Sequence, residues 1–272
     1  MSEQEYDEGT SAWSTRRMIA AGFLAVLVVA AAALFIVNRN GGDDSSSTGS
    51  GSSTQQEGKS LADEYEWKHK EADFFGQMVY AAEDSRGQIL SETTREYESP
   101  TSTEARDSRA EGVVFQATDF SGRLPIPFST TDGPTGFDGM VPVGYSQSAA
   151  GASLAAAAYI TQMYNPPSYA EYIEKATTDP TTEELSEARK RVADNAEYFD
   201  AGDDIVGFAN TAYDVVTFDG DYARVNLFVR DNHDGVGQVT MDLRWVDGMW
   251  KGDETSDLSV LDAMPQGVSI WR

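Results

Sequence analysis

Twenty consecutive residues without a charged side chain, Met18 to Val37, constrain this chain more than any other segment. With a rise of about 1.5 Å per residue, a helix of this length spans roughly 30 Å, the thickness of the hydrocarbon core of a bilayer. A soluble helix needs apolar side chains on one face only, whereas this run is apolar on every face. We therefore predict a transmembrane helix over residues 18–37.

The charges beside this run indicate its orientation. Arg16 and Arg17 precede it and Arg39 follows it, so the positive-inside rule places residues 1–17 in the cytoplasm as a short tail. The main alternative is a cleaved signal peptide. The run is longer than a usual signal core, and no clear small-x-small cleavage site follows Val37. We expect a single-pass protein of the cell membrane whose C-terminal domain is extracytoplasmic.

Composition divides the rest of the chain into three parts. Residues 38–60 contain the run SSSTGSGSSTQQ, which is typical of a flexible linker. Residues 61–111 are charged and polar with scattered aromatic side chains, and we interpret them as a stalk followed by a second linker. Residues 112–272 form the expected folded domain.

Within that domain, helical signals come first and strand signals follow. We predict helices over Ser148 to Tyr164 and Tyr169 to Ala176, and a third that begins with the capping box of Thr181 and Glu184. Apolar and polar residues then alternate from residue 222 to 229 and from 238 to 245, with Asp-Gly pairs between the runs. The order predicts an α+β fold in which helices pack on one face of a curved antiparallel sheet, an arrangement that can close into a cystatin-like cone.

Charge and cysteine content exclude several functions. The chain has 45 acidic residues against 20 Lys and Arg, a net charge of -25. Nucleic-acid binding requires clustered basic side chains, so we expect no nucleic-acid partner. The absence of cysteine excludes disulfides, thiolate zinc sites and cysteine nucleophiles.

No set of residues in the sequence demands catalysis. The two histidines, His69 and His233, lie in different segments, which disfavours a shared metal site. The turn around Asp234-Gly235 resembles a calcium loop, but that alignment puts Arg230 at the first ligand position. The remaining candidates are acidic pairs, read as solvated turns, and aromatic residues that either line a pocket or fill a core: Asp203 with Asp204, Asp219 with Asp221, Asp257 with Asp262, and Tyr145, Tyr159, Trp245 and Trp250. We expect no catalytic, cofactor-binding or metal-binding residue, no cofactor and no enzyme activity.

Two stretches resemble known families. The residues Leu124-Pro-Ile-Pro-Phe-Ser, Gly133-Pro134, Val143-Gly144-Tyr145-Ser146 and Gly151-Ala152 resemble a group of uncharacterised membrane-anchored actinobacterial proteins, which often have conjugation genes as neighbours. The ending Leu243 to Lys251 is similar to the last hairpin of nuclear transport factor 2-like domains, which occur in conjugation and type IV secretion scaffold proteins. Together these resemblances cover roughly residues 112–272 and imply no catalytic residues.

These observations lead to one main expectation and two rivals. We expect a non-catalytic, membrane-anchored envelope protein whose outer domain mediates protein–protein contacts, in a conjugation or secretion assembly. Its partners are the membrane, through residues 18–37, and other envelope proteins. The first rival is an extracytoplasmic module that binds a small ligand in a cone-shaped pocket. The second, an exported enzyme acting through paired carboxylates, is the weakest.

Overall fold

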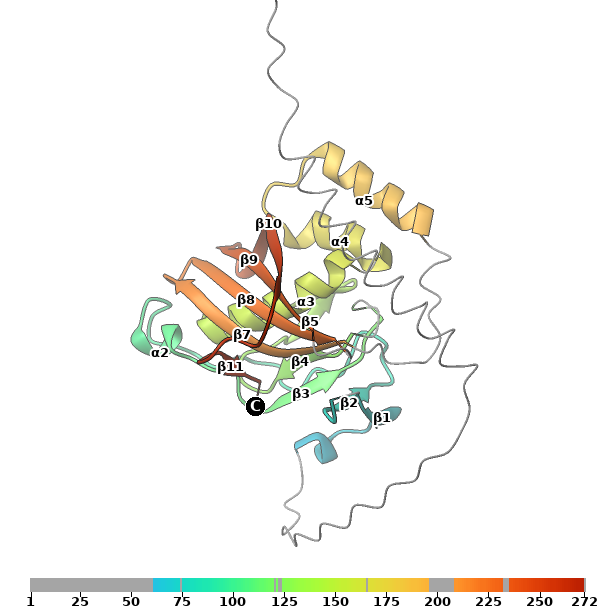
Figure 1. Ribbon diagram of the computed structural model, residues 1–272. Coiled ribbons are helices and arrows are strands. Elements are labelled where there is room, and N and C mark those ends of the chain that lie inside the picture. The colour runs from blue at the N-terminus through green and yellow to red at the C-terminus, as the bar shows by residue number, and fades with distance from the viewer. Residues whose placement is uncertain are drawn as a thin grey trace, which may run out of the picture. The chain divides into compact units, whose positions relative to one another are not determined.

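A computed structural model describes residues 61–73, 75–119, 121, 124–164, 166–195, 208–231 and 235–271, which lie in one compact unit, Glu57–Arg272. Figure 1 shows its helices and strands. In chain order these are the 3₁₀ turn Leu61–Glu64, β1 (His69–Ala72), β2 (Met78–Ala81), α2 (Thr103–Arg106), β3 (Val113–Gln116), β4 (Ile126–Ser129), β5 (Gly136–Asp138), β6 (Val141–Val143), α3 (Ala149–Tyr164), α4 (Pro166–Ala176), α5 (Thr182–Asn195), β7 (Phe208–Phe218), β8 (Tyr222–Asp231), β9 (Val236–Val246), β10 (Met249–Leu261) and β11 (Ser269–Ile270).

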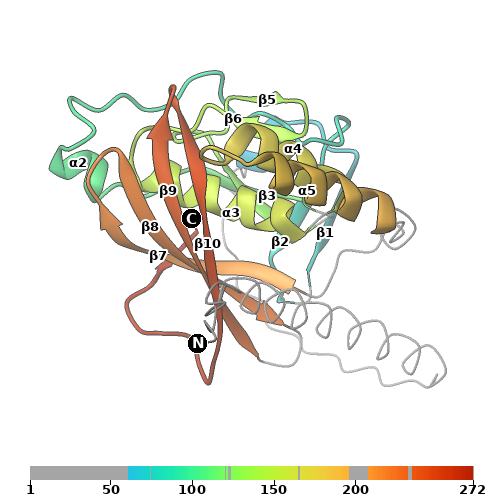
Figure 2. The same ribbon diagram turned by 90° about the horizontal axis from the view of Figure 1, so that it is seen from above.

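Helix α3 lies at the centre of this unit (Figure 2). It contacts β7, β8 and β9 on one side and β4 on another, and α4 packs against it as well. All of its residues from Ala149 to Gln162 are buried. A helix buried on every side must be apolar or small on every side, which explains its alanine-rich sequence. Small side chains also let neighbouring backbones come close.

The long antiparallel sheet has the order β10-β9-β8-β7-β11. The alternation seen in the sequence sends one set of side chains toward α3 and the other outward. Val225 pairs with Met241 on the inner face, and Leu227 pairs with Val239. On the outer face Arg224 and Asp242 form an ion pair with 2.7 Å between Nη2 and Oδ2.

A second sheet has the order β1-β2-β3-β4, and β5 and β6 form a separate hairpin. In the second sheet only β2 and β3 run parallel. Two prolines occur in these short strands, Pro127 in β4 and Pro142 in β6. Both strands lie at a sheet edge, where the missing N–H of proline costs no ladder hydrogen bond.

The predicted fold class is wrong. The described residues are mostly in sheets, with 24% of them helical and 35% in strands, and they do not form a set of helices on one face of a single sheet. Part of the error comes from residues 61–111, which we expected to form a stalk and a second linker. They supply β1, β2 and α2 instead, and β1 and β2 join β3 and β4 in a second sheet that we did not expect. Strands of three or four residues are too short to show a period-two pattern. The prolines and glycines in and around them also indicated loops.

The predicted transmembrane helix is not among the elements that the structure describes. Among the described residues no helix is both long and apolar enough to cross a membrane. The most apolar of them, α3, has 16 residues and is enclosed by the protein itself, whereas a span needs about 20. Residues 18–37, on which the prediction rested, lie outside the described residues.

Several local predictions are confirmed. The helix expected over Ser148 to Tyr164 is α3. The capping box that opens α5 forms as predicted: the amide of Thr181 donates to Glu184 Oε2 at 2.7 Å, and the amide of Glu184 donates to the Thr181 hydroxyl at 3.2 Å. Helix α4 begins earlier than expected, because Pro166 occupies the first helical position, where its missing N–H is tolerated.

Gly151 in the first turn of α3 gives a sharp test of this packing. Glycine to alanine in a helix normally stabilises by up to about 1 kcal/mol. Here a Cβ at position 151 would overlap the carbonyl oxygen of Ser146. We predict that Gly151→Ala lowers the free energy of unfolding by about 1 to 3 kcal/mol, measured by denaturant titration with tryptophan fluorescence.

The matched control is Gly237→Ala in β9, where the nearest atom to an added Cβ is 3.8 Å away, an ordinary contact. Equal stability changes in the two variants would contradict the prediction.

Candidate functional site

The outer edge of β7 is only partly covered. β8 pairs with β7 along one side, while β11 pairs on the other side only with Ala212 and Tyr213. Within the described part of the chain, no strand pairs with that side from Asp214 to Phe218. An open edge presents free backbone N–H and C=O groups, which can accept another strand.

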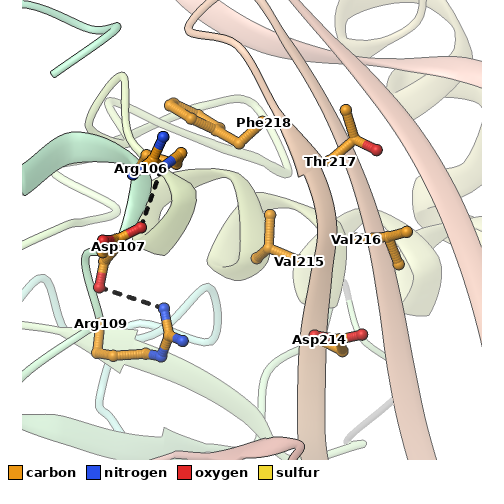
Figure 3. A pocket seen from close by; sticks show the side chains of 8 residues that line it. All are labelled: Arg106, Asp107, Arg109, Asp214, Val215, Val216, Thr217 and Phe218. Atoms are coloured by element: carbon orange, nitrogen blue, oxygen red, sulfur yellow. Dashed lines mark hydrogen bonds and ion pairs between the residues drawn. The ribbon is translucent and has the colours of Figure 1, made fainter. Parts of the chain in front are cut away.

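A cleft of about 430 Å³ runs along this open edge. One wall is the strand from Asp214 to Phe218, and the other is formed by Arg106, Asp107 and Arg109 at the end of α2. In Figure 3, Arg106 lies at the Phe218 end of the cleft and Arg109 at the Asp214 end. Val215 points toward the α2 wall and Val216 points away from it.

Apolar and charged groups are mixed in this cleft. The side chain of Val216 is 52% exposed, an uncommon position for a valine in a strand. Arg106 Nε lies 3.1 Å from Asp107 Oδ1, and Arg109 donates to the carbonyl oxygens of Asp107 and Ser108 at 3.3 and 2.9 Å. Two arginines face two aspartates, so the cleft is balanced in charge within a chain whose net charge is -25.

The α2 wall is held by hydrogen bonds to the start of α3. The hydroxyl of Ser102 caps α2 by accepting from the amide of Ala105 at 3.1 Å. Ser108 is buried just after α2, and its hydroxyl accepts from the amide of Ala150 at 3.0 Å and donates to the carbonyl of Ala105 at 2.8 Å. Arg106 and Arg109 therefore extend from a fixed backbone, although their own side chains face solvent.

A buried carboxylate anchors the segment that leads to this wall. Asp132 has no exposed surface. Its Oδ1 accepts from the hydroxyls of Ser146 at 2.7 Å and Tyr97 at 3.1 Å, and its Oδ2 accepts from Thr131 Oγ1 at 2.7 Å. Ser148, the residue before α3, also donates to Oδ1 at 3.3 Å.

Tyr97 connects this group to the residues before α2. Burial, followed by the nearby charge of Asp132, raises the pKa of the Tyr97 phenol, so it remains a donor at neutral pH. Arg95, two residues earlier, donates its amide to the carbonyl of Thr131 at 2.6 Å and pairs with Glu111 at 2.9 Å. Loop 129–134, the start of α3 and residues 95–111 thus share one polar network.

Among the described residues, the acidic and histidine candidates do not come together as a site. His69 is exposed in β1 beside Glu71, with 3.3 Å between Nε2 and Oε2. Asp219 accepts from the amides of the β7–β8 turn, and Asp221 accepts from Gln147. His233, Asp203 and Asp204 lie outside the described residues, and no group of metal-ligating side chains occurs among those that are described.

The aromatic candidates are core residues. Tyr159 and Trp250 have no exposed surface and Tyr145 is 5% exposed. Tyr145 packs edge-on against Tyr159 at 6.4 Å between ring centroids, and Trp245 against Trp250 at 5.2 Å. The indole N–H of Trp250 donates to the carbonyl of Ser146 at 2.9 Å. None of these four residues lines the cleft at β7.

Sequence reasoning missed the site at β7. Its one local signal is the run Asp214-Val-Val-Thr-Phe218, which favours a strand and lacks the lysines and prolines that usually protect an edge. The alternation of apolar and polar residues does not distinguish a central strand from an edge strand. The α2 wall comes from a segment more than a hundred residues before β7 in the chain.

Removing the carboxylate of Asp132 should weaken the polar network that links the α2 wall to the start of α3. Asp132→Ala leaves several buried hydroxyls without their acceptor, and we predict a loss of about 2 to 4 kcal/mol in the free energy of unfolding. Asp132→Asn retains one acceptor oxygen and should lose less. Denaturant titration of both variants measures the difference. If Asp132→Ala were as stable as the native chain, the network would have no structural role.

Comparisons with known proteins place the chain in a family. It matches a domain of unknown function, DUF8175, over residues 80–266, which include the α2 wall and the whole of β7 to β10. No curated protein and no solved structure matches it. The family match names neither a source organism nor an assembly, so the actinobacterial and conjugation assignments are without support. Because the match spans more than half of the sequence, this chain belongs to the DUF8175 family.

Proposed function

We propose that this protein is a non-catalytic docking protein that binds an extended segment of a protein partner along the open edge of β7. The observation that carries the proposal is the unpaired stretch from Asp214 to Phe218 beside the cleft at α2. In strand addition, backbone hydrogen bonds supply affinity and side chains beside the strand supply specificity. Val216 offers an apolar contact, and Arg106 and Arg109 offer charged ones.

The mechanism follows from the geometry of the edge. The strand from Asp214 to Phe218 is already ordered by its ladder with β8, which one bulge interrupts between Val215 and Thr217, so most of the chain entropy lost on binding is that of the partner segment. The α2 wall is fixed to α3 by Ser108, so the arginines extend from a positioned backbone. A pre-ordered edge of this kind binds peptides better than a flexible loop of the same composition.

The proposed location is the cell envelope, with the described unit outside the membrane. The apolar residues 18–37, the basic residues before them and the linker over residues 38–60 support this part of the proposal. The likeness of the β9–β10 hairpin to the last hairpin of nuclear transport factor 2-like scaffold domains supports a contact role. A small-ligand pocket is less well supported, because the aromatic residues suggested for it fill the core.

Replacing Val216 with lysine tests the docking edge. Lysine is a common guard residue of natural sheet edges, and the native side chain is half exposed, so Val216→Lys should change the free energy of unfolding by no more than about 0.5 kcal/mol. We expect the variant, purified from its own membranes in mild detergent, to lose the proteins that co-purify with the native chain, as measured by quantitative mass spectrometry.

The matched control is Val260→Lys. Val260 is 61% exposed in β10, at the opposite edge of the same sheet. This variant should retain the partners. Retention of the same partners by the Val216 variant would rule out the edge of β7 as the docking site.

Deleting residues 18–37 tests the proposed location separately. The native chain should remain in the membrane fraction after alkaline carbonate extraction, because transfer of such an apolar segment into lipid is strongly favourable. The deletion variant should move to the soluble fraction with its unfolding transition unchanged. A native chain released by carbonate would argue against attachment through these residues.

A further inference from the structure

Residues 262–271 form a strap that joins β10, at one edge of the long sheet, to β11 beside β7 (Figure 1). We propose that this strap is a displaceable occupant of the docking edge. A partner segment of similar chemistry releases β11 and pairs with β7 along a longer stretch. The inference rests on the proposed function, and it adds the regulation of the docking edge and the chemistry of the partner segment.

The strap is held at β7 by few backbone contacts. β11 pairs with β7 at two positions only, Ser269 with Tyr213 and Ile270 with Ala212, whereas β8 pairs with the same strand from one end to the other. The apolar side chain of Ile270 is 57% exposed. A segment with few ladder pairs and little buried surface opens at a lower free-energy cost than the rest of a sheet.

Trp271 anchors the strap but leaves a buried polar group unsatisfied. Its ring stacks on Tyr213 with 4.2 Å between the ring centroids, and only 9% of the residue is exposed. Its indole Nε1 is buried, and no described residue accepts a hydrogen bond from it. Such an N–H has lost its hydrogen bond to water and gained none in return. Release of the strap restores that hydrogen bond, which favours opening.

A small apolar surface lies under the strap, on the outer face of the long sheet. It consists of Ala212, Phe228 and Val236, and Met264 and Val268 of the strap pack against it. This cluster is separate from the core around α3. Its cover therefore comes from the strap, and a segment that replaces the strap gains an apolar contact there.

The strap also covers the most regular part of the docking edge. β7 has bulges on both sides of the stretch from Ala212 to Val215, and within that stretch its register with β8 is unbroken. β11 occupies the first two of these four residues. The part that is open with the strap in place, Asp214 to Phe218, contains the second bulge. Release of β11 therefore makes the regular stretch available to an added strand.

The strap itself indicates which segments fit this edge. Val268 packs on the outer apolar cluster, Ile270 lies opposite Ala212 of that cluster, and Trp271 stacks on Tyr213 toward the core. Alternate side chains of an extended segment point to opposite faces of a sheet. The partner segment is therefore extended, with aliphatic residues at alternate positions and an aromatic residue directly after the second.

A disulfide between β7 and β11 tests the displacement, because the chain has no cysteine of its own. Ala212 and Ile270 lie directly opposite one another. Full-length chain with Ala212→Cys and Ile270→Cys therefore closes the strap on oxidation and frees it on reduction. The control combines Gly237→Cys with Val260→Cys, which lie directly opposite one another in β9 and β10.

The probe is a fluorescein-labelled peptide with the sequence of residues 262–271. Its binding to the full-length chain in mild detergent is measured by fluorescence anisotropy. Oxidation of the 212–270 pair should raise the dissociation constant at least about tenfold, since only the open state binds the peptide. Oxidation of the control pair should leave the constant unchanged. Trp271→Ala frees the edge and should lower the constant about tenfold. Unfolding midpoints confirm that each variant is folded.

The outcomes separate this inference from the proposed function. Equal binding by the oxidised and reduced 212–270 variant, or no binding to any form, overturns the displacement of the strap. The docking edge is judged on the proteins that co-purify with the native chain. If Val216→Lys loses them and the oxidised 212–270 variant retains them, the docking edge stands without displacement. Loss from both variants supports both proposals, and retention by both contradicts both.

Discussion

The burial of α3 on all sides is the constraint on which the rest of the structure depends. Because the long sheet covers one side of the helix and β4 and α4 cover others, each of these elements needs α3 to bury its own apolar face. The sequence meets this requirement with small side chains, which allow close packing but each contribute little buried apolar surface. Tyr159 and Trp250 supply the missing bulk, and the Tyr159 hydroxyl donates to the Trp250 carbonyl at 2.9 Å.

A second constraint is the polar network around Asp132. A buried carboxylate is costly unless its oxygens accept hydrogen bonds, and here hydroxyl groups from three segments satisfy them. Since Ser146 and Ser148 precede α3 and Tyr97 precedes α2, the network fixes these segments to one another. Glycines pack tightly around it: a Cβ on Gly133 or Gly144 would overlap neighbouring atoms, which explains glycine at both positions.

The functional proposals follow from what this packing leaves uncovered. The short strand β11 stops after two residues, and Trp271 then turns inward to stack on Tyr213 at 4.2 Å between ring centroids. The stretch of β7 beyond Tyr213 keeps its outer edge open. The α2 segment, fixed through Ser108 and linked to the Asp132 network, forms a wall beside that edge with balanced charges. The same polar network thus stabilises the fold and positions the candidate site.

The sequence by itself determined the local elements whose signals are long or chemically specific. The alanine-rich run of α3, the capping box of Thr181 and Glu184, and the alternation in β8 and β9 were all predicted, because hydrophobic periodicity over ten or more residues reflects burial on one face. Composition also excluded cysteine chemistry, and it predicted that no nucleic acid is bound. It predicted an anchor at residues 18–37, which lie outside the described residues.

Only the tertiary structure decided the fold class and the candidate site. β1 to β6 have only three or four residues each, so neither the pairing of β1 to β4 into a second sheet nor that of β5 with β6 could be predicted from the sequence. Whether β7 is an edge strand depends on where β11 ends, and its neighbour α2 comes from a distant part of the chain. Such contacts depend on long-range packing, which no local run of residues encodes.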